Sequence, residues 1–101
     1  MKKQKKKKIL KYTKCFKVHE KELTWELFTK YLNENMEFCF YFNNITIDIA
    51  FHYENKIKVY ELNIFSGEKI TNLVFNSVDE LTSFKAFNNK TLYDIWDELE
   101  N

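Results

Sequence analysis

The stretch that decides the fold is MEFCFYFNNITIDIAFHY, residues 36–53. On both sides of Asn43-Asn44, apolar side chains occupy every second position, as in β-strands that bury one face. Asparagine tolerates the left-handed backbone of a two-residue hairpin turn. The stretch therefore predicts two antiparallel strands, over residues 36–42 and 45–53, in a sheet that is covered on one side. The side chains expected on its open face include those of Cys39, Tyr41, Ala50 and His52.

Two further strands are predicted directly after this hairpin. In residues 57–65 the apolar side chains change from odd to even positions near Val59, which predicts a β-bulge there. Ser66-Gly67-Glu68-Lys69 is a turn signal that contains the only glycine of the chain, and residues 70–75 follow as a shorter strand. We expect a four-stranded antiparallel meander, because consecutive strands usually pair.

Helices are predicted on both sides of the meander. Residues 21–33 carry apolar side chains at helical spacing. Ser77 to Glu80 and Thr91 to Asp94 have the pattern of capping boxes, and apolar residues at helical spacing follow each of them. The fold class is therefore α+β, with an N-terminal helix, the meander, and two short C-terminal helices packed on one sheet face. The predicted core comprises Leu27, Phe38, Phe40, Ile47, Ile49, Phe51, Leu81, Ile95 and Trp96.

Charge is distributed unevenly along the chain. Residues 1–17 hold nine lysines and no acidic residue, whereas residues 18–101 hold seven lysines and all 15 acidic residues, a net charge of −8. We predict a basic tail over residues 1–9, disordered or bound to a partner, on a single α+β domain over residues 10–101. Within that domain, residues 10–18 alternate weakly and predict an edge strand.

Composition and spacing exclude several classes of protein. No apolar run approaches the roughly 18–20 residues that cross a bilayer, so no membrane contact is expected. Only two apolar residues, Ile9 and Leu10, follow the basic run before Lys11, which is too little for the hydrophobic region of a signal peptide. A cytoplasmic location in a bacterial or host cell is therefore predicted. The two cysteines have no CxxC spacing and are expected to be reduced.

Candidate catalytic residues are few. Asp48 and His52 lie on the same face of a predicted strand and suggest a general-base or metal pair. Strand positions four apart are separated by roughly 13 Å, however, which is too far for shared ligation. Cys39 has no neighbour in sequence that would activate its thiol. We therefore predict no enzyme activity, no catalytic residue, no metal and no cofactor.

Two charged surfaces are the candidate binding sites. Arrayed carboxylates can stand in for phosphates and occupy a basic groove, whereas lysines can neutralise phosphates directly. For each surface the alternative is a charged face that only keeps the protein soluble. The acidic face, predicted to bind protein, comprises Glu22, Glu26, Glu34, Asp79, Glu80, Asp94, Asp97 and Glu98. The lysines predicted to bind nucleic acid are Lys3, Lys5, Lys6, Lys7, Lys8 and Lys11.

The C-terminal stretch from Phe75 to Leu99 carries a resemblance. Its Phe-Asn-Ser-Val-Asp-Glu-Leu, followed by Asn-Lys-Thr-Leu-Tyr-Asp-Ile-Trp-Asp, resembles the ending of small proteins from low-GC bacteria and their phages. The short helix and the Phe-rich hairpin strands before it resemble the layout of these proteins as well. Asn89 stands where this pattern has glycine.

Some small acidic phage proteins of this kind are anti-CRISPR or other anti-defence inhibitors, which block effectors by binding. The resemblance implies a non-catalytic inhibitor of a host CRISPR-Cas effector or a similar ribonucleoprotein, whose guide or target nucleic acid the lysine tail could contact. The alternative is a small nucleic-acid-binding accessory protein that acts through its Lys-rich N-terminus. Either could be a monomer or a homodimer.

Overall fold

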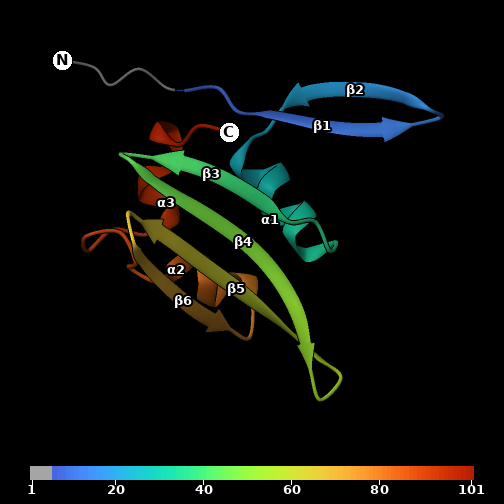
Figure 1. Cartoon of the computed structure of the whole chain (residues 1–101). Coiled ribbons are helices and arrows are strands. Elements are labelled where there is room, and N and C mark those ends of the chain that lie inside the picture. Colours follow the sequence, from blue (N-terminus) through green and yellow to red (C-terminus); the bar gives the residue numbers. More distant parts are fainter. Residues whose placement is uncertain (1–5) are drawn as a thin grey trace.

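A computed structural model describes residues 6–101, which form two antiparallel sheets and a small set of helices (Figure 1). The α+β class predicted from the sequence is correct. The elements in chain order are β1 (Ile9–Lys14), β2 (Lys17–Glu22), α1 (Trp25–Asn33), β3 (Phe38–Phe42), β4 (Ile45–Glu54), β5 (Ile57–Ser66), β6 (Lys69–Phe75), α2 (Val78–Ser83), α3 (Leu92–Ile95) and the 3-10 turn η1 (Trp96–Glu98).

The larger sheet is the predicted meander, with strand order β3-β4-β5-β6. Asn43 and Asn44 both adopt the left-handed conformation and connect β3 to β4, so the hairpin that decides the fold is confirmed. The pairing of β4 with β5 runs without interruption from Ile45 opposite Ser66 to Glu54 opposite Ile57. The bulge predicted near Val59 is therefore wrong.

The burial of Val59, rather than a bulge, accounts for the change of apolar side chains from odd to even positions in β5. It lies opposite His52, on the face of the sheet away from the helices, and is nevertheless buried. The next residue, Tyr60, is buried on the helix side. Apolar residues thus occupy both odd and even positions because this part of β5 is buried on both faces.

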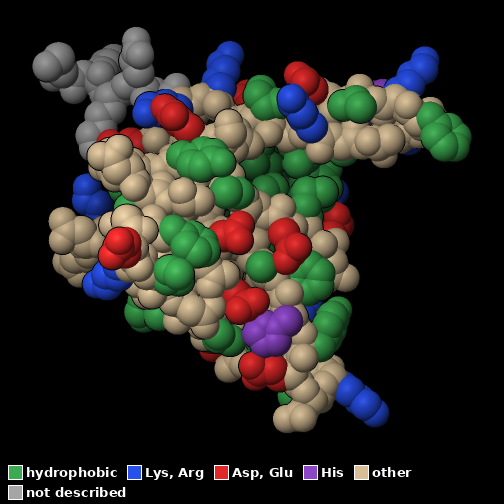
Figure 2. Space-filling view, viewed as in Figure 1, with side chains coloured by type: hydrophobic (Ala, Val, Ile, Leu, Met, Phe, Trp, Pro, Cys, Tyr) green, Lys and Arg blue, Asp and Glu red, His purple; other side chains and the backbone are tan. Residues whose placement is uncertain are grey.

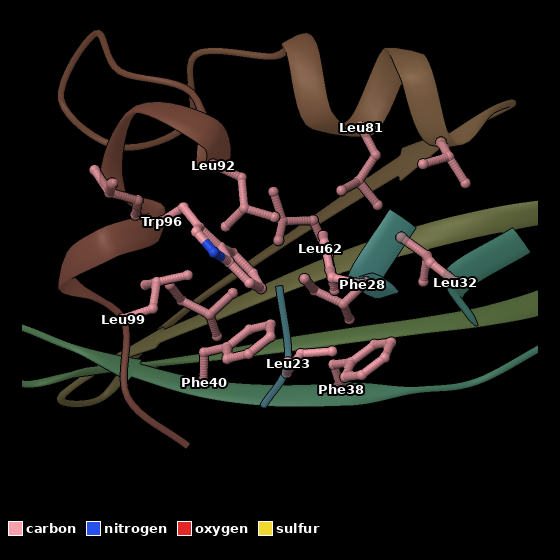
Figure 3. Packing of buried hydrophobic residues seen from close by; sticks show 14 of the residues in the cluster. Leu23, Phe28, Leu32, Phe38, Phe40, Leu62, Leu81, Leu92, Trp96 and Leu99 are labelled. Carbon is pink, nitrogen blue, oxygen red and sulfur yellow. The ribbon is translucent and has the colours of Figure 1, made fainter. Parts of the chain in front are cut away.

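The core lies between the inner face of the four-stranded sheet and the helices (Figure 3). Phe28 of α1 is fully buried at its centre, and its ring lies 5.0 to 5.6 Å from those of Phe38, Phe40 and Trp96. Leu81 of α2 is fully buried in the same core. Most of the predicted core is buried, but Leu27 and Phe51 only pack against it from partly exposed positions.

The N-terminal part of the domain differs from the prediction. Residues 10–18 are not one edge strand, because the chain reverses at Cys15-Phe16 and β1 pairs with β2 from Ile9 opposite Glu22 to Lys14 opposite Lys17. The first helix begins at Trp25 rather than at residue 21, since Thr24 caps it by accepting a hydrogen bond from the Leu27 amide. The β1–β2 hairpin projects away from the rest of the molecule (Figure 1).

Residues 6–8 also depart from the expectation of a solvated tail. The Lys6 amide donates to the Asp97 carbonyl, and Lys8 is only 2% exposed. The Asn101 side chain hydrogen-bonds both the amide and the carbonyl of Ile9. The chain is therefore packed against its own C-terminal segment from Lys6 onward. No helix in residues 6–101 has the length and apolar character needed to span a membrane.

Candidate binding surfaces

Four of the predicted acidic residues surround one hollow of about 600 Å³, which we call the acidic cleft. Glu22 ends β2 and Glu26 lies in the first turn of α1, while Asp94 and Asp97 come from α3 and η1. All four side chains are exposed. The fold brings these carboxylates together because the start of α1 packs beside α3. The remaining lining residues are Lys6, Lys8, Leu23, Thr24, Trp25, Tyr93 and Trp96.

Aromatic rings form the wall of the acidic cleft. The Trp25 ring lies 5.0 Å from Tyr93 and 5.3 Å from Trp96, edge-on to both. The Lys8 ammonium lies 4.5 Å from the centre of the Trp96 ring and donates to the Lys6 carbonyl. Sequence reasoning did not select Trp25 or Tyr93 as site residues. The available signal was an aromatic residue just inside each helix cap, at Thr24 and Thr91.

Asp94 has a second role in this cleft. Its carboxylate accepts a hydrogen bond from the Thr91 amide, and its own amide donates to the Thr91 hydroxyl, which completes the predicted capping box. These bonds to Thr91 lower the pKa of Asp94 below its usual value, because they stabilise the carboxylate. Asp94 is therefore an anion at neutral pH, and its substitution would also weaken α3.

The other predicted acidic residues lie elsewhere. Glu34 caps the far end of α1, Asp79 lies in the first turn of α2, and Glu98 belongs to η1 without lining the cleft. The Glu80 carboxylate accepts from the Asn76 amide while Ser77 accepts from the Glu80 amide, so the cap of α2 closes one residue earlier than the capping box predicts. The predicted acidic face is thus one cleft and several separate carboxylates.

The predicted lysines are likewise divided. Lys3 and Lys5 lie outside the described residues. Lys6 lines the acidic cleft and pairs with Glu100 at 2.6 Å, and Lys8 is buried. Lys7 is exposed, and Lys11 lies on the β1–β2 hairpin, 3.6 Å from Glu20.

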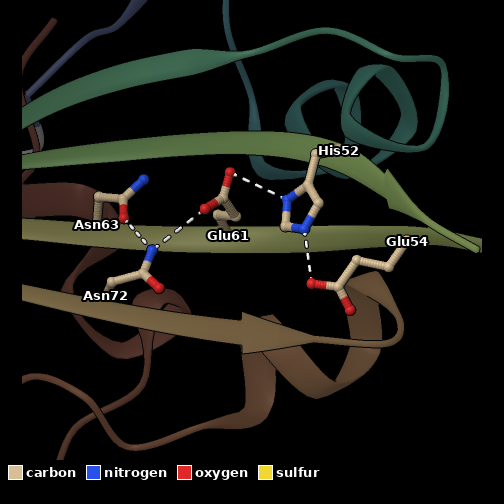
Figure 4. Close-up of polar contacts among 5 residues, drawn as sticks. All are labelled: His52, Glu54, Glu61, Asn63 and Asn72. Carbon is tan, nitrogen blue, oxygen red and sulfur yellow. Dashed lines mark hydrogen bonds and ion pairs between the residues drawn. The ribbon is translucent and has the colours of Figure 1, made fainter.

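The open face of the four-stranded sheet carries a polar network centred on His52 (Figures 2 and 4). The Nε2 atom of His52 lies 2.9 Å from a Glu54 oxygen, and its Nδ1 atom lies 3.2 Å from a Glu61 oxygen. Glu61 also accepts from the Asn72 amide group. Asp48, the partner suggested by the sequence, lies opposite Asn63 on β5 and is not part of this network. Glu61 was missed because it reaches His52 from the neighbouring strand.

Both ring nitrogens of His52 face carboxylates, which only accept hydrogen bonds, so the protonated ring satisfies both. The bond to Glu54, with a further contribution from Glu61, raises the pKa of His52 above its ordinary value. Since the pKa is higher in the folded state, this stabilisation is fully present below about pH 6.5 and is lost as the pH rises through the folded pKa.

We therefore expect Glu54→Gln to lower the pKa of His52, measured from its ring proton shifts by NMR titration. Glu68→Gln makes the same charge change at the exposed turn before β6 and should leave this pKa unchanged. In urea unfolding, the stability difference between the native protein and His52→Gln should shrink as the pH rises. A difference that is constant with pH contradicts the ion-pair network.

Within residues 6–101, no group of three or more His, Cys, Asp or Glu side chains is placed to hold a metal ion. Comparison of the chain with protein families, with curated proteins and with solved structures finds no match. The arrangement of side chains is therefore the basis for a functional proposal.

Proposed function

We propose that the protein is a non-catalytic inhibitor that binds a cationic protein surface of a nucleic-acid-processing complex through the acidic cleft. The observation that carries this proposal is the convergence of Glu22, Glu26, Asp94 and Asp97 around an aromatic wall. These carboxylates come from two segments of the chain, residues 22–26 and 94–97, and the tertiary fold brings the two segments together. They are exposed and can therefore meet a partner.

The chemistry of the cleft suits a lysine or arginine side chain. A cation over an aromatic face is stabilised by about 0.5–2 kcal/mol, depending on how far it is desolvated, and carboxylates at the rim steer cationic partners. The contact between Lys8 and Trp96 is an internal example of the same recognition. Grooves that bind nucleic acid are lined with such cations, so a protein that presents carboxylates can compete with phosphates for them.

A CRISPR-Cas effector is the specific target we propose, in line with the resemblance of the C-terminal stretch to small phage proteins. Effectors of this class hold guide and target strands in positively charged channels. The excess of carboxylates over residues 18–101 suits the protein part of such a complex, whereas the lysines of residues 1–17 other than buried Lys8 suit its nucleic acid. A ribonucleoprotein therefore matches both signs of charge.

The test uses the two tryptophans, Trp25 and Trp96, which both line the cleft and report on it by their fluorescence. Nona-arginine is titrated as a model of a cationic surface, and inhibition of target cleavage by CRISPR effectors is measured in parallel. We expect Glu22→Lys combined with Glu26→Lys to weaken peptide binding at least tenfold and to abolish inhibition.

The matched control is Glu34→Lys combined with Glu68→Lys, which makes the same charge change at exposed positions outside the cleft. It should retain most of the binding and all of the inhibition. Equal losses in both double variants would show that only net charge matters. Inhibition that survives the reversal of Glu22 and Glu26 overturns the assignment to this cleft.

The second candidate function is a nucleic-acid-binding accessory protein that acts through the N-terminal lysines. Exposed Lys7, beside a run of lysines, favours it. A truncation before Ile9 is a poor test, because it also removes buried Lys8. Lys2, Lys3, Lys5 and Lys7 replaced together by Gln should instead weaken binding to oligonucleotides and reduce its dependence on salt if this function holds.

A further inference from the structure

The tip of the β1–β2 hairpin is built from residues that oppose its own folding. Cys15 and Phe16 form the turn, and both adopt the left-handed conformation, with φ of 53° and 63°. Bulky side chains are rare in this conformation. Every other pair of consecutive left-handed residues in residues 6–101 begins with asparagine, which tolerates it. The tip thus lacks the asparagine that begins the other turns of this kind.

Two more features of the tip are unfavourable in the isolated protein. The Phe16 side chain is fully exposed, at 103% of its reference area. Lys14 and Lys17 lie directly opposite each other, and like charges in this position repel. Neither lysine has a carboxylate within ion-pair distance among the described residues. An anionic partner with an apolar or aromatic surface would cover the Phe16 ring and offset the repulsion between Lys14 and Lys17.

The length of the hairpin separates this tip from the acidic body. Six residues per strand at roughly 3.3 Å each place the tip about 20 Å from the hairpin base. This distance exceeds twice the Debye length of about 8 Å at physiological ionic strength. The repulsion between the carboxylates of the body and an anion at the tip is therefore largely screened.

We propose that the hairpin tip binds single-stranded nucleic acid, with Phe16 stacked on an unpaired base and Lys14 and Lys17 on the flanking phosphates. The ring and the two ammonium groups supply the combination that single strands recognise, a stacking platform within a cationic path. This surface is separate from the acidic cleft, so the inference stands or falls independently of the inhibitor function proposed for that cleft.

The expected gains and costs in binding affinity favour a single strand over a duplex or a membrane as the partner. One stacked base raises affinity by roughly 5- to 150-fold, whereas entering a duplex requires a base step to be unstacked, which offsets a gain of that size. A membrane needs more apolar area than one ring provides, because even a myristoyl chain binds bilayers with an association constant of only about 10⁴ M⁻¹.

The decisive variant is Phe16→Gly, because glycine favours the left-handed turn and the hairpin should fold at least as well. In fluorescence anisotropy with a labelled single-stranded oligonucleotide, we expect the dissociation constant to rise about fivefold or more. Phe16→Leu, which keeps an apolar side chain without a π-face, should lose affinity as well, and Phe16→Trp should retain it. The matched control is Asn44→Gly, which places glycine at the equivalent position of the β3–β4 turn. This variant should bind the oligonucleotide as the native protein does.

Heparin, duplex DNA and phosphatidylserine vesicles distinguish the other partners. Heparin is a polyanion without bases, so its binding should not change in Phe16→Gly. Lys14→Gln with Lys17→Gln should reduce the slope of log affinity against log salt by about 1.4, whereas Lys56→Gln with Lys69→Gln should leave it unchanged. Oligonucleotide binding that is insensitive to Phe16→Gly, an equal loss toward heparin, or Phe16-dependent binding to duplex or vesicles alone overturns the proposal.

Discussion

Phe28→Ala is expected to lower the free energy of unfolding by about 3–5 kcal/mol, which is a large part of the 5–15 kcal/mol typical of a domain. The reason is its central position, since Phe28 is fully buried and contacts rings from α1, β3 and η1 (Figure 3). Its removal leaves a cavity that neither the sheet nor the helices can fill without moving. Urea denaturation followed by far-UV circular dichroism measures the loss.

The control for this prediction is Phe65→Ala, which removes the same side chain from the open face of the sheet. Phe65 is 37% exposed, so we expect its loss to cost less than about 1 kcal/mol. Phe28→Leu retains much of the buried volume and keeps the comparison possible if the alanine variant does not fold. Equal costs at positions 28 and 65 contradict a core centred on Phe28.

The meander was predictable because its signals are local. Asn43-Asn44 and the single Gly67 mark turns that need a left-handed backbone, and alternation on either side fixes which face is buried. The β1–β2 hairpin was not predictable, since Cys15-Phe16 carries no turn signal. The start of α1 was misplaced for a related reason, because apolar spacing alone does not show that Thr24 caps the helix.

The candidate site was less accessible to sequence reasoning than the fold. Glu22, Glu26, Asp94 and Asp97 were selected as charged positions on separate elements, and the packing that gathers them around Trp25 is a long-range contact. The same limit applies to His52, whose partner Glu61 lies on the adjacent strand. Sequence spacing thus indicated which residues are charged, whereas tertiary structure determines which of them act together.

Lys8→Glu is expected to lower the free energy of unfolding by about 3–5 kcal/mol, as is typical when a buried charge loses its compensation. The introduced carboxylate would face the electron-rich side of the Trp96 ring and the Lys6 carbonyl, both of which now attract an ammonium. Urea unfolding that monitors tryptophan fluorescence measures the effect, because Trp96 is the ring in contact.

Lys7→Glu provides the matched control, since it makes the same charge change one residue away at an exposed position. Its expected effect stays within about 0.5 kcal/mol. In the run Lys5-Lys6-Lys7-Lys8 nothing in the sequence distinguishes these lysines, and only the fold assigns one to solvent and the other to the aromatic wall of the acidic cleft. Similar stabilities for the two variants would mean that residues 6–8 do not pack as the structure has them. A large difference would establish that residues 6–8 are part of the domain. Fewer lysines would then remain for an anionic partner.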